Sequence, residues 1–474
     1  MRLSVFNHYV PGFPDPEDTL IYNTFSGAYV ALPTSTVDAL QRMDGGETLT
    51  PRERELVGDP DLYDPDVGVV VDSLEAEEAE FQQWFARRRN LHRRLDVVVG
   101  VNLACNFACT YCLQDGVLDG TVIKPDTADA TADWLVAHTI DNDLQAVNLM
   151  FVGGEPLLHP QRIKRIAERV KAGIGDRELT FSLTTNGYFL TRDVVTELIP
   201  YGLRKAQVTL DGDATTHAKT RVCKSGEDTF GRILDNVIAA SRLIRISING
   251  NYQGDTIHGF GPLIRQLAQV MPRGTEVSFS PALQTMSSPE GSGSGSCSWS
   301  GSDTRYHVAL HDEAVRNGLY TSPLNVIGPC EFHDTHAFAI DPGGTIYKCP
   351  GFLGIEDWGI GHVQTGLTGR YQEMLQLTPK SEPCGGCSHR PHCGGGCVAA
   401  EWIRTGDTSR VNCEHGYFED VKRDAVIRNY AIAIEDDAEV AARTFPAAPH
   451  ALPREQSQST PRQVRSMGLR VLSG

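Results

Sequence analysis

The stretch LDVVVGVNLACNFACTYC, residues 95–112, joins an apolar run to three closely spaced cysteines. The run 96–102 is predicted to be a buried strand, because near-continuous apolar residues are typical of parallel strands. Cys105, Cys109 and Cys112 follow it directly. Three thiolates at this spacing can bind three corners of an iron–sulfur cube and leave the fourth iron without a protein ligand. A zinc site with its fourth ligand elsewhere is the alternative.

The pattern of strand, loop and helix repeats as far as about residue 281. Six βα units with apolar strands predict an α/β fold with a parallel sheet that is buried on both faces. Six units are too few to close an eight-stranded barrel, so an open partial barrel and a doubly wound sheet both fit the pattern. In either fold the functional loops should follow the carboxyl ends of the strands. The predicted strands are 96–102, 146–151, 178–184, 205–210, 244–249 and 276–280.

The spacing Cys-x3-Cys-x2-Cys, with Tyr111 before the last cysteine, resembles the signature of the radical S-adenosylmethionine (SAM) superfamily. The resemblance implies a partial (β/α)6 barrel and a [4Fe-4S] cluster whose open iron is chelated by the amino and carboxylate groups of SAM. It also implies reductive cleavage of SAM to methionine and a 5′-deoxyadenosyl radical, which abstracts a substrate hydrogen. The ligands of this cluster would be Cys105, Cys109 and Cys112.

Further motifs of this superfamily stand after the next strands. The GGEP segment 153–156 resembles the loop that holds the SAM amino group, with Glu155 against the ammonium and glycines that allow close backbone approach. The segment 182–187 resembles the ribose contact. The residues before Arg221 resemble an HDxxR pattern, with Ala218 in place of the Asp, which implies that Arg221 pairs with the SAM carboxylate. The residues expected to bind SAM are Tyr111, Gly153, Gly154, Glu155, Ser182, Asn186 and Arg221.

Seven more cysteines lie between residues 330 and 413, and their order resembles the SPASM domain that follows many radical SAM barrels. The resemblance assigns one complete auxiliary [4Fe-4S] cluster to four of them and a second cluster, with one ligand missing, to the other three. Cys297, water or a substrate group could complete the second cluster. Zinc could instead occupy the Cys-x2-Cys portion, with His389 or His392 as ligands. The complete set is Cys384, Cys387, Cys393 and Cys413, and the incomplete set is Cys330, Cys349 and Cys397.

Residues 1–94 are predicted to form a small α+β unit. Alternating segments at 20–23 and 28–32 flank a turn and predict a β-hairpin. A helix with a capping box is expected at 35–43, and a longer helix from Asp72. The unit is similar to the peptide-recognition module of ribosomal-peptide maturases, which binds a leader segment by adding a strand to a sheet edge. A cap over the barrel opening is the alternative.

Composition suggests the remaining boundaries. The Gly/Ser-rich stretch 287–302 predicts a flexible connector, and the tail from residue 447 has a composition typical of disorder. A helix is expected at 428–445. The Cys-rich segment has little periodicity, which indicates a unit organised by metal rather than by a hydrophobic core. The predicted division is 1–94 for the N-terminal unit, 95–285 for the barrel, 286–325 for the connector, 326–430 for the SPASM domain and 431–474 for the C-terminal helix and tail.

The 474 residues carry 43 Lys and Arg against 60 Asp and Glu, a net charge of −17. This balance excludes a general attraction to nucleic acids or anionic lipids. The N-terminus has no apolar stretch of signal-peptide length, and the chain has no apolar run of about 18 residues. We therefore expect a cytoplasmic protein without nucleic-acid or membrane partners. In that compartment its 12 cysteines should serve metal ligation or catalysis rather than disulfides.

The motifs together favour a radical SAM/SPASM maturase that crosslinks or oxidises a ribosomally made precursor peptide or client protein, with electrons from a donor such as flavodoxin or ferredoxin. An anaerobic sulfatase maturase, which produces formylglycine, is the alternative. Such enzymes carry an Asp after the second SPASM cysteine, where this chain has Pro350. A mycofactocin- or quinone-type maturase also fits the cysteines. An electron carrier or a zinc-stabilised peptide-binding module would need no GGEP loop. No residue is assigned as the general base.

Overall fold

The structure is a computed structural model of the 474-residue chain. It describes residues 1–89, 93–112, 114, 116–282, 305–322, 330–376, 384–405, 407, 410–413, 415–434 and 470–472. The predicted connector at 287–302, which contains Cys297, and most of the predicted tail lie outside the described residues. No helix in these ranges is long and apolar enough to cross a membrane.

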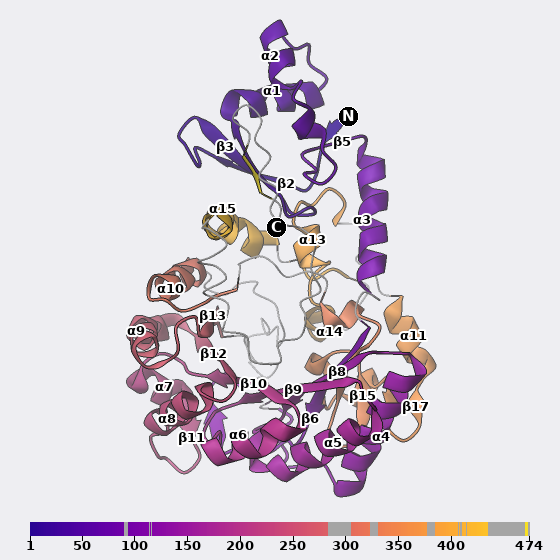
Figure 1. Cartoon of the computed structure of the whole chain (residues 1–474), viewed down its shortest axis with the longest axis vertical. Coiled ribbons are helices and arrows are strands. Elements are labelled where there is room, and N and C mark those ends of the chain that lie inside the picture. Colours follow the sequence, from indigo (N-terminus) through magenta and orange to yellow (C-terminus); the bar gives the residue numbers. More distant parts are fainter. Residues whose placement is uncertain are drawn as a thin grey trace.

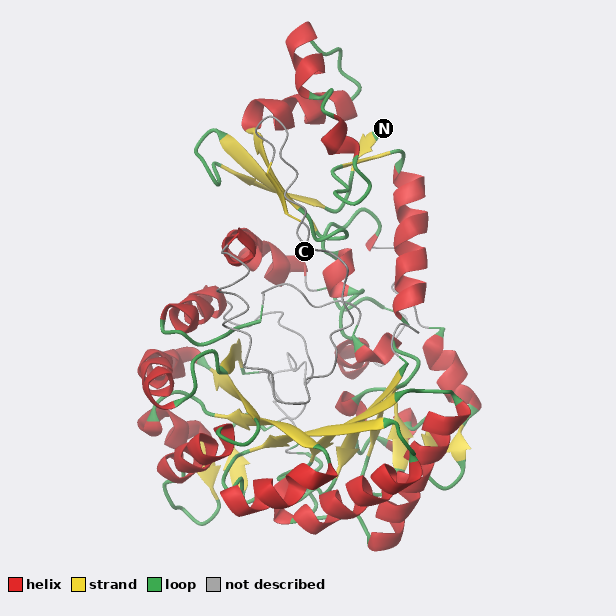
Figure 2. Ribbon diagram, in the orientation of Figure 1, coloured by secondary structure: helices red, strands yellow, loops and turns green. Residues whose placement is uncertain are grey.

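The six predicted parallel strands are present and lie side by side in the order of the chain. A doubly wound sheet would reverse its strand order part-way, so this order identifies an open partial barrel. The helices surround the outer face of the sheet (Figures 1 and 2). The strands are β6 (Arg94–Gly100), β8 (Ala146–Val152), β9 (Glu178–Thr185), β10 (Leu203–Thr209), β12 (Arg245–Tyr252) and β13 (Glu276–Pro281), and the helices are α4 (Pro125–Asp141), α5 (Pro160–Gly173), α6 (Arg192–Leu198), α7 (Ala214–Thr220), α8 (Phe230–Ser241), α9 (Phe260–Val270) and α10 (Arg305–Arg316).

The two faces of this sheet differ in burial. In β9, Leu179, Phe181 and Leu183 are buried, whereas Ser182 on the other face is half-buried. Met150 in the neighbouring β8 is 38 % exposed on that same face. The prediction of strands buried on both faces is therefore wrong for the concave face. A six-stranded sheet curves without closing, and in the described part of the chain the barrel helices lie on its outer face (Figure 1).

The Cys-rich segment continues the barrel sheet. Its first strand, β14, pairs parallel with β6, and three short antiparallel strands follow. Phe338, Tyr347 and Trp358 are buried in the same hydrophobic core as the barrel strands. The prediction of a unit organised without a hydrophobic core is therefore wrong. Its strands escaped prediction because strands this short carry too little periodicity to be detected. The elements are β14 (Ala337–Ile340), β15 (Thr345–Tyr347), β16 (Gly361–His362), β17 (Gly366–Leu367), α11 (Gly369–Leu375), α13 (Arg390–Cys393) and α14 (Val398–Thr405).

The N-terminal unit contains the predicted hairpin, extended by a third antiparallel strand. Two details of its helices differ from the prediction. The first helix follows Pro33 and has no side-chain cap. The longer one is capped by Ser73, whose Oγ accepts from the amide of Ala76 at 3.1 Å, so it begins after the predicted Asp72. The elements are β1 (Arg2–Leu3), β2 (Asn7–Pro11), β3 (Asp18–Asn23), β4 (Tyr29–Pro33), α1 (Thr34–Asp44), α2 (Pro51–Leu56), β5 (Val70–Val71) and α3 (Leu74–Arg88).

The C-terminal part also differs from the prediction. The last helix, α15 (His415–Ile434), begins before the predicted residue 428. Its sequence has no clear apolar stripe, so the pattern does not mark the start of the helix. Three residues of the predicted disordered tail form β18 (Arg470–Leu472), which pairs antiparallel with β4. The prediction of disorder is wrong for these three residues. The sheet order in the N-terminal unit is therefore β18-β4-β3-β2.

The N-terminal unit packs on the Cys-rich segment (Figure 1). Arg390 of α13 is 2 % exposed, pairs with Glu78 of α3 and places its Cζ 4.1 Å from the centroid of the Phe81 ring. The hydroxyl of Tyr22 in β3 lies 3.1 Å from His392 Nε2. The segment with the second set of cysteines thus supports the N-terminal sheet directly.

Candidate active site

The three cysteines after β6 lie on a loop that is fastened to the loop after β10. β7 (Phe107–Cys109) pairs antiparallel with β11 (Arg221–Cys223), which places Arg221 opposite Cys109. Burial raises the pKa of the Cys105 thiol and raises that of Cys109 to about 11, and neighbouring thiols add to both shifts. Such a group of thiols fits an iron–sulfur cluster, because a metal binds thiolates and releases their protons.

The GGEP loop packs directly against the cysteine loop. A Cβ on Gly154 would lie 2.3 Å from the carbonyl oxygen of Ala104, and one on Gly153 would lie 2.6 Å from that of Asn102. The amide of Glu155 donates to the Ala104 carbonyl at 2.7 Å, and Asn102 Nδ2 donates to the Glu155 carbonyl at 2.9 Å. The two glycines therefore hold the cysteine loop at contact distance, where any side chain would push it away.

The Glu155 carboxylate has no exposed surface, and both of its oxygens are used within the protein. Oε1 accepts from Thr185 Oγ1 at 2.7 Å and from the amide of Leu157 at 3.0 Å, and Oε2 accepts from the amide of Asn186 at 2.8 Å. Burial raises the pKa of Glu155, and these hydrogen bonds oppose that shift. The side chain thus connects the GGEP loop to the end of β9. Its predicted contact with the SAM ammonium stays a prediction.

Of the two residues predicted to contact the ribose, Ser182 lies within β9 and Asn186 directly after it. Asn186 follows the strand, is 5 % exposed, and its Nδ2 donates to Asn106 Oδ1 of the cysteine loop at 2.8 Å. Ser182 lies within the strand, in register with Met150 of β8 and Lys205 of β10, and is half-buried on the concave face. Asn186 is therefore part of the framework of the loops, whereas Ser182 faces the interior of the barrel.

Tyr111 is the centre of a buried polar network beside the cysteine loop. Its hydroxyl donates to Asp211 Oδ2 and accepts from Arg221 Nη1 at 3.0 Å and from Asn251 Nδ2 at 3.3 Å. Asp211 is fully buried and also accepts from the amide of Asn251 at 2.8 Å and from Thr220 Oγ1 at 3.2 Å. Burial raises the pKa of Asp211, and the Arg221 charge opposes this shift.

Arg221 is 9 % exposed, and its Nε has no hydrogen-bond partner among the described residues. Burial alone would lower its pKa, but the acidic groups around it raise the pKa, so the guanidinium stays charged. A buried guanidinium with a free N–H fits a carboxylate ligand such as the one predicted for SAM.

Sequence reasoning assigned no role to Asp211, Asn251 or Asn106, although Asp211 stands next to the fourth strand. Asn251 lies near the carboxyl end of β12, and Asn106 lies between the first two cysteines of the loop. Polar residues at strand ends are the signal that could have identified the first two. Their joint contact with Tyr111 depends on residues 100 to 140 positions apart in the chain, which no local pattern reports.

Thiols of the second set of cysteines lie near one another in two groups, and their assignment to two clusters stays a prediction. Burial raises the pKa of Cys349 to about 12, and the thiols of Cys330 and Cys397 raise it further. Burial likewise raises the pKa of Cys393 to about 12, with added effects from the thiols of three more cysteines. The members of the second group are Cys384, Cys387, Cys393 and Cys413. Both groups offer the gathered thiols that a cluster or a zinc ion needs.

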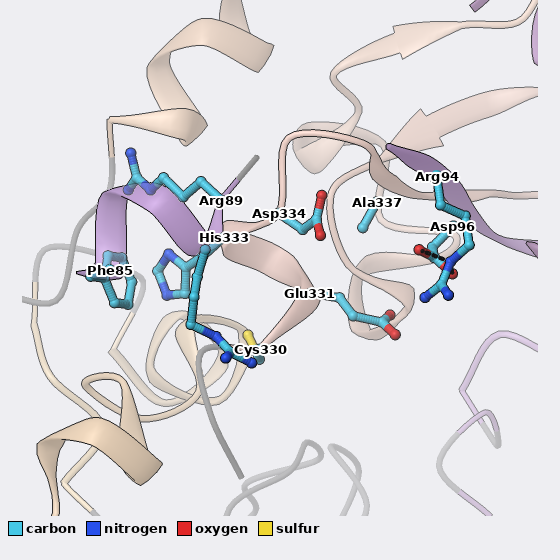
Figure 3. A pocket seen from close by; sticks show the side chains of 10 residues that line it. Phe85, Arg89, Arg94, Asp96, Cys330, Glu331, His333, Asp334 and Ala337 are labelled. Atoms are coloured by element: carbon cyan, nitrogen blue, oxygen red, sulfur yellow. Dashed lines mark hydrogen bonds and ion pairs between the residues drawn. The ribbon is translucent and has the colours of Figure 1, made fainter. Parts of the chain in front are cut away.

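A cavity of about 160 Å³ borders Cys330 (Figure 3). Arg88 and Arg89 from the end of α3 line it together with Arg94 and Asp96 from β6. The segment 87–94 carries a basic run of five arginines, Arg87, Arg88, Arg89, Arg93 and Arg94. Arg94 pairs with Asp96 at 2.9 Å, and Arg88 lies over the ring of Trp84 at 5.2 Å. These contacts favour a structural role for this part of the run.

Residues 101–260, which include the three cysteines, the GGEP loop and Arg221, match the radical SAM superfamily in a comparison with protein families. This part of the chain is a radical SAM domain. Such a domain implies a [4Fe-4S] cluster and SAM as cofactors, and the partial barrel predicted from the sequence agrees with it.

This radical SAM protein has two kinds of named relatives. It is 30% identical over 223 residues to the GTP 3′,8-cyclase of Klebsiella pneumoniae (strain 342), which is 45% of this chain and 60% of the cyclase. It is 26% identical over 347 residues to the mycofactocin maturase MftC of Mycobacterium tuberculosis (strain ATCC 25618 / H37Rv), which is 67% of this chain and 82% of MftC. The chain therefore spans less than two thirds of the cyclase.

Among solved structures, this radical SAM protein is similar to anSMEcpe with bound AdoMet, with a TM-score of 0.56 and 15% identity over 74% of this chain and 98% of that chain. A second structure of anSMEcpe, with bound AdoMet and Kp18Cys peptide, has a TM-score of 0.51 at 15% identity over 72% of this chain and 99% of that chain. At this identity the likeness shows the fold alone. It extends well beyond residues 101–260.

Proposed function

We propose that this radical SAM protein is a maturase that crosslinks or oxidises a residue of a ribosomally made precursor peptide. The observation that carries the proposal is the Cys-rich segment, which adds two groups of thiols to the barrel and continues its sheet beside β6. The relatives support it: MftC is named a maturase and matches over 82% of its length, whereas the cyclase matches over 60%. The anSMEcpe structure with a bound peptide has the same fold.

When bound, a [4Fe-4S] cluster and SAM supply the one-electron cleavage that produces a 5′-deoxyadenosyl radical. Cys105, Cys109 and Cys112 would hold the cluster. Arg221, which the Tyr111 hydroxyl positions at 3.0 Å, would bind the SAM carboxylate through its free Nε–H. Ser182 would face the ribose from the concave side of the sheet.

Glu155 would act indirectly. Its two oxygens are occupied by the amides of Leu157 and Asn186 and by the Thr185 hydroxyl. The residue would therefore shape the loop that receives the SAM amino group, and Gly153 and Gly154 would keep that loop against the cysteine loop.

The second set of cysteines would hold two auxiliary [4Fe-4S] clusters. Cys384, Cys387, Cys393 and Cys413 would bind one of them completely. Cys330, Cys349 and Cys397 would bind the other and leave one iron for Cys297, water or a substrate group. Iron–sulfur clusters near the barrel would accept the second electron of an oxidation or bind the client. A one-electron donor such as flavodoxin or ferredoxin would start the reaction.

The N-terminal unit would recognise the leader segment of the client. Its sheet ends at β2 on one side, an edge to which an extended peptide could add a strand. The unit packs on the Cys-rich segment through Arg390 and Tyr22, so a peptide bound there would be held close to the auxiliary cysteines.

A formylglycine-generating sulfatase maturase is the second candidate, favoured by the fold of anSMEcpe and opposed by Pro350. This proline begins the short 3-10 turn Pro350–Phe352 directly after Cys349, and the following amide, of Gly351, donates to Cys349 Sγ at 3.3 Å. No carboxylate occupies the position where the resemblance expects the base.

The proposal is tested with protein purified without oxygen. We expect roughly twelve irons per chain, about eight in a Cys105/Cys109/Cys112→Ala variant, and 5′-deoxyadenosine formation that Cys109→Ala abolishes. Co-expression with candidate precursor peptides should then produce a peptide that has lost two hydrogens, seen by mass spectrometry. About four irons together with zinc would contradict the auxiliary clusters. Absence of 5′-deoxyadenosine from fully loaded, reduced protein would contradict the enzyme itself.

A further inference from the structure

Two histidines and a glutamate meet where the Cys-rich segment contacts the last helix. His389 precedes α13, His415 begins α15, and Glu419 lies one turn further along that helix. One ligand atom from each of the three lies within 4.8 Å of the others. His389 Nε2 is 2.7 Å from Glu419 Oε1. None of these three residues is a ligand in the two predicted cysteine clusters.

Helix geometry explains two members of this cluster. Residues four apart on an α-helix share one face, so His415 and Glu419 project toward the same neighbour. That neighbour is His389, whose ring stacks on Phe418 with centroids 5.1 Å apart and planes at 21°. Two ligands at this helical spacing, completed by a third from another segment, form a common pattern of zinc sites with nitrogen and oxygen ligands.

An independent observation comes from the N-terminal unit. His8 on β2 is 4 % exposed, and its ring lies edge-on to His389 with centroids 4.4 Å apart. Its Nε2 is buried and has no hydrogen-bond partner in the part of the chain that the structure describes. A buried polar atom without a partner is costly, so its place beside His389, one of the three potential ligands, indicates a missing bound group.

We propose that His389, His415 and Glu419 bind one zinc ion, and that His8 completes the site. Ligand atoms around a tetrahedral zinc lie about 3.3 Å apart at the usual bond lengths, so the atoms here need to move by about an ångström. Lys422, whose Nζ is 2.8 Å from Glu419 Oε2, would release the carboxylate to the metal. The site would connect β2 of the N-terminal unit, the segment before α13, and α15.

This zinc site does not depend on the proposed function. His389 and His415 each lie two residues beyond a cysteine of the predicted complete cluster, Cys387 and Cys413. The metal would therefore fix the position of those two cysteines relative to the N-terminal sheet. Its loss should loosen the N-terminal unit without changing the barrel.

The test measures zinc in holoprotein whose cysteines have been loaded with iron and sulfide, so that zinc bound at empty cysteine sites is excluded. We expect about one zinc per chain by mass spectrometry. X-ray absorption at the zinc edge should show nitrogen and oxygen neighbours at about 2.0–2.1 Å and no sulfur at about 2.3 Å. His415→Ala and the isosteric Glu419→Gln should lose this zinc and keep the iron. His8→Phe should weaken zinc binding at least tenfold.

Asp424→Asn, which removes an exposed acid from the same helix, is the matched control and should keep the zinc. A holoprotein without zinc at a stoichiometric supply of the ion would overturn the proposal. Zinc with sulfur neighbours would overturn it too, as would zinc that persists in both Glu419→Gln and His415→Ala. In those cases the cluster is an ion pair between His389, Glu419 and Lys422.

Discussion

Gly154→Ala should disable the SAM-cleaving site while the rest of the protein stays folded. The added Cβ would lie 2.3 Å from the Ala104 carbonyl oxygen and 3.0 Å from the amide nitrogen of Cys105. Carbon–oxygen contacts of this kind are normally 3.3–3.6 Å, so the two loops must separate by about 1 Å. The hydrogen bond from the Glu155 amide to Ala104, now 2.7 Å, would then exceed bonding distance.

These contacts allow the loss of stability and the loss of activity in Gly154→Ala to be estimated separately. One broken backbone hydrogen bond costs about 1 kcal/mol of stability, too little to unfold the chain. A shift of about 1 Å in the loop that carries Cys105 costs far more in function, about 10²-fold in rate, since the reacting groups lose their alignment. We therefore expect 5′-deoxyadenosine formation to fall about a hundredfold at nearly unchanged thermal stability.

The assay compares Gly154→Ala with Gly116→Ala, a glycine between β7 and α4 whose added Cβ would meet nothing within 4 Å. 5′-Deoxyadenosine is measured by chromatography from anaerobic protein with a chemical reductant, and iron is counted in parallel. The control should match the wild type. A Gly154→Ala variant with wild-type turnover would refute the reasoning, because the loops would then tolerate a separation that the structure excludes.

Three further predictions concern other contacts. Tyr111→Phe removes the hydroxyl that joins Asp211 to Arg221, so SAM affinity should fall about tenfold in calorimetry of reconstituted protein; an unchanged dissociation constant would show that Arg221 needs no such support. Arg390→Met removes a buried guanidinium that is stacked on Phe81 and paired with Glu78. Urea unfolding should show that the free energy of unfolding falls by about 1–3 kcal/mol and that Arg390→Lys does not restore it. A lysine variant as stable as the wild type would contradict the role of the planar group. Burial lowers the pKa of His217 to about 3 and that of His307 to about 4, below the ordinary 6.5. The folded protein therefore keeps both histidines neutral, while the unfolded chain takes up a proton at each of them below pH 6.5. The free energy of unfolding is thus unaffected above pH 6.5 and falls as the pH drops below it, by up to about 1.4 kcal/mol per pH unit for each histidine. The thermal midpoint should therefore drop between pH 7 and pH 5.5, and less steeply in His217→Phe; an identical slope in the variant would contradict this assignment.

The barrel was largely predictable because its evidence is local. Each strand is a short apolar run followed by a helical pattern, and all six were found within a few residues of their observed ends. The choice between an open barrel and a doubly wound sheet was not predictable, since strand order depends on which strands pair. Burial of both faces was predicted wrongly for the same reason: closure is a property of the whole sheet.

The sequence by itself determined how the cysteines are spaced along the chain. Covalent spacing limits which thiols can reach one cluster, and thiols of each predicted set lie near one another in the structure, whereas their assignment to clusters stays a prediction. Only the tertiary structure decided how Tyr111, Asp211 and Asn251 meet, and why His8 lies against His389. Their partners are 100 residues or more apart in the chain, and a contact at that separation exists only after the sheets have formed and packed.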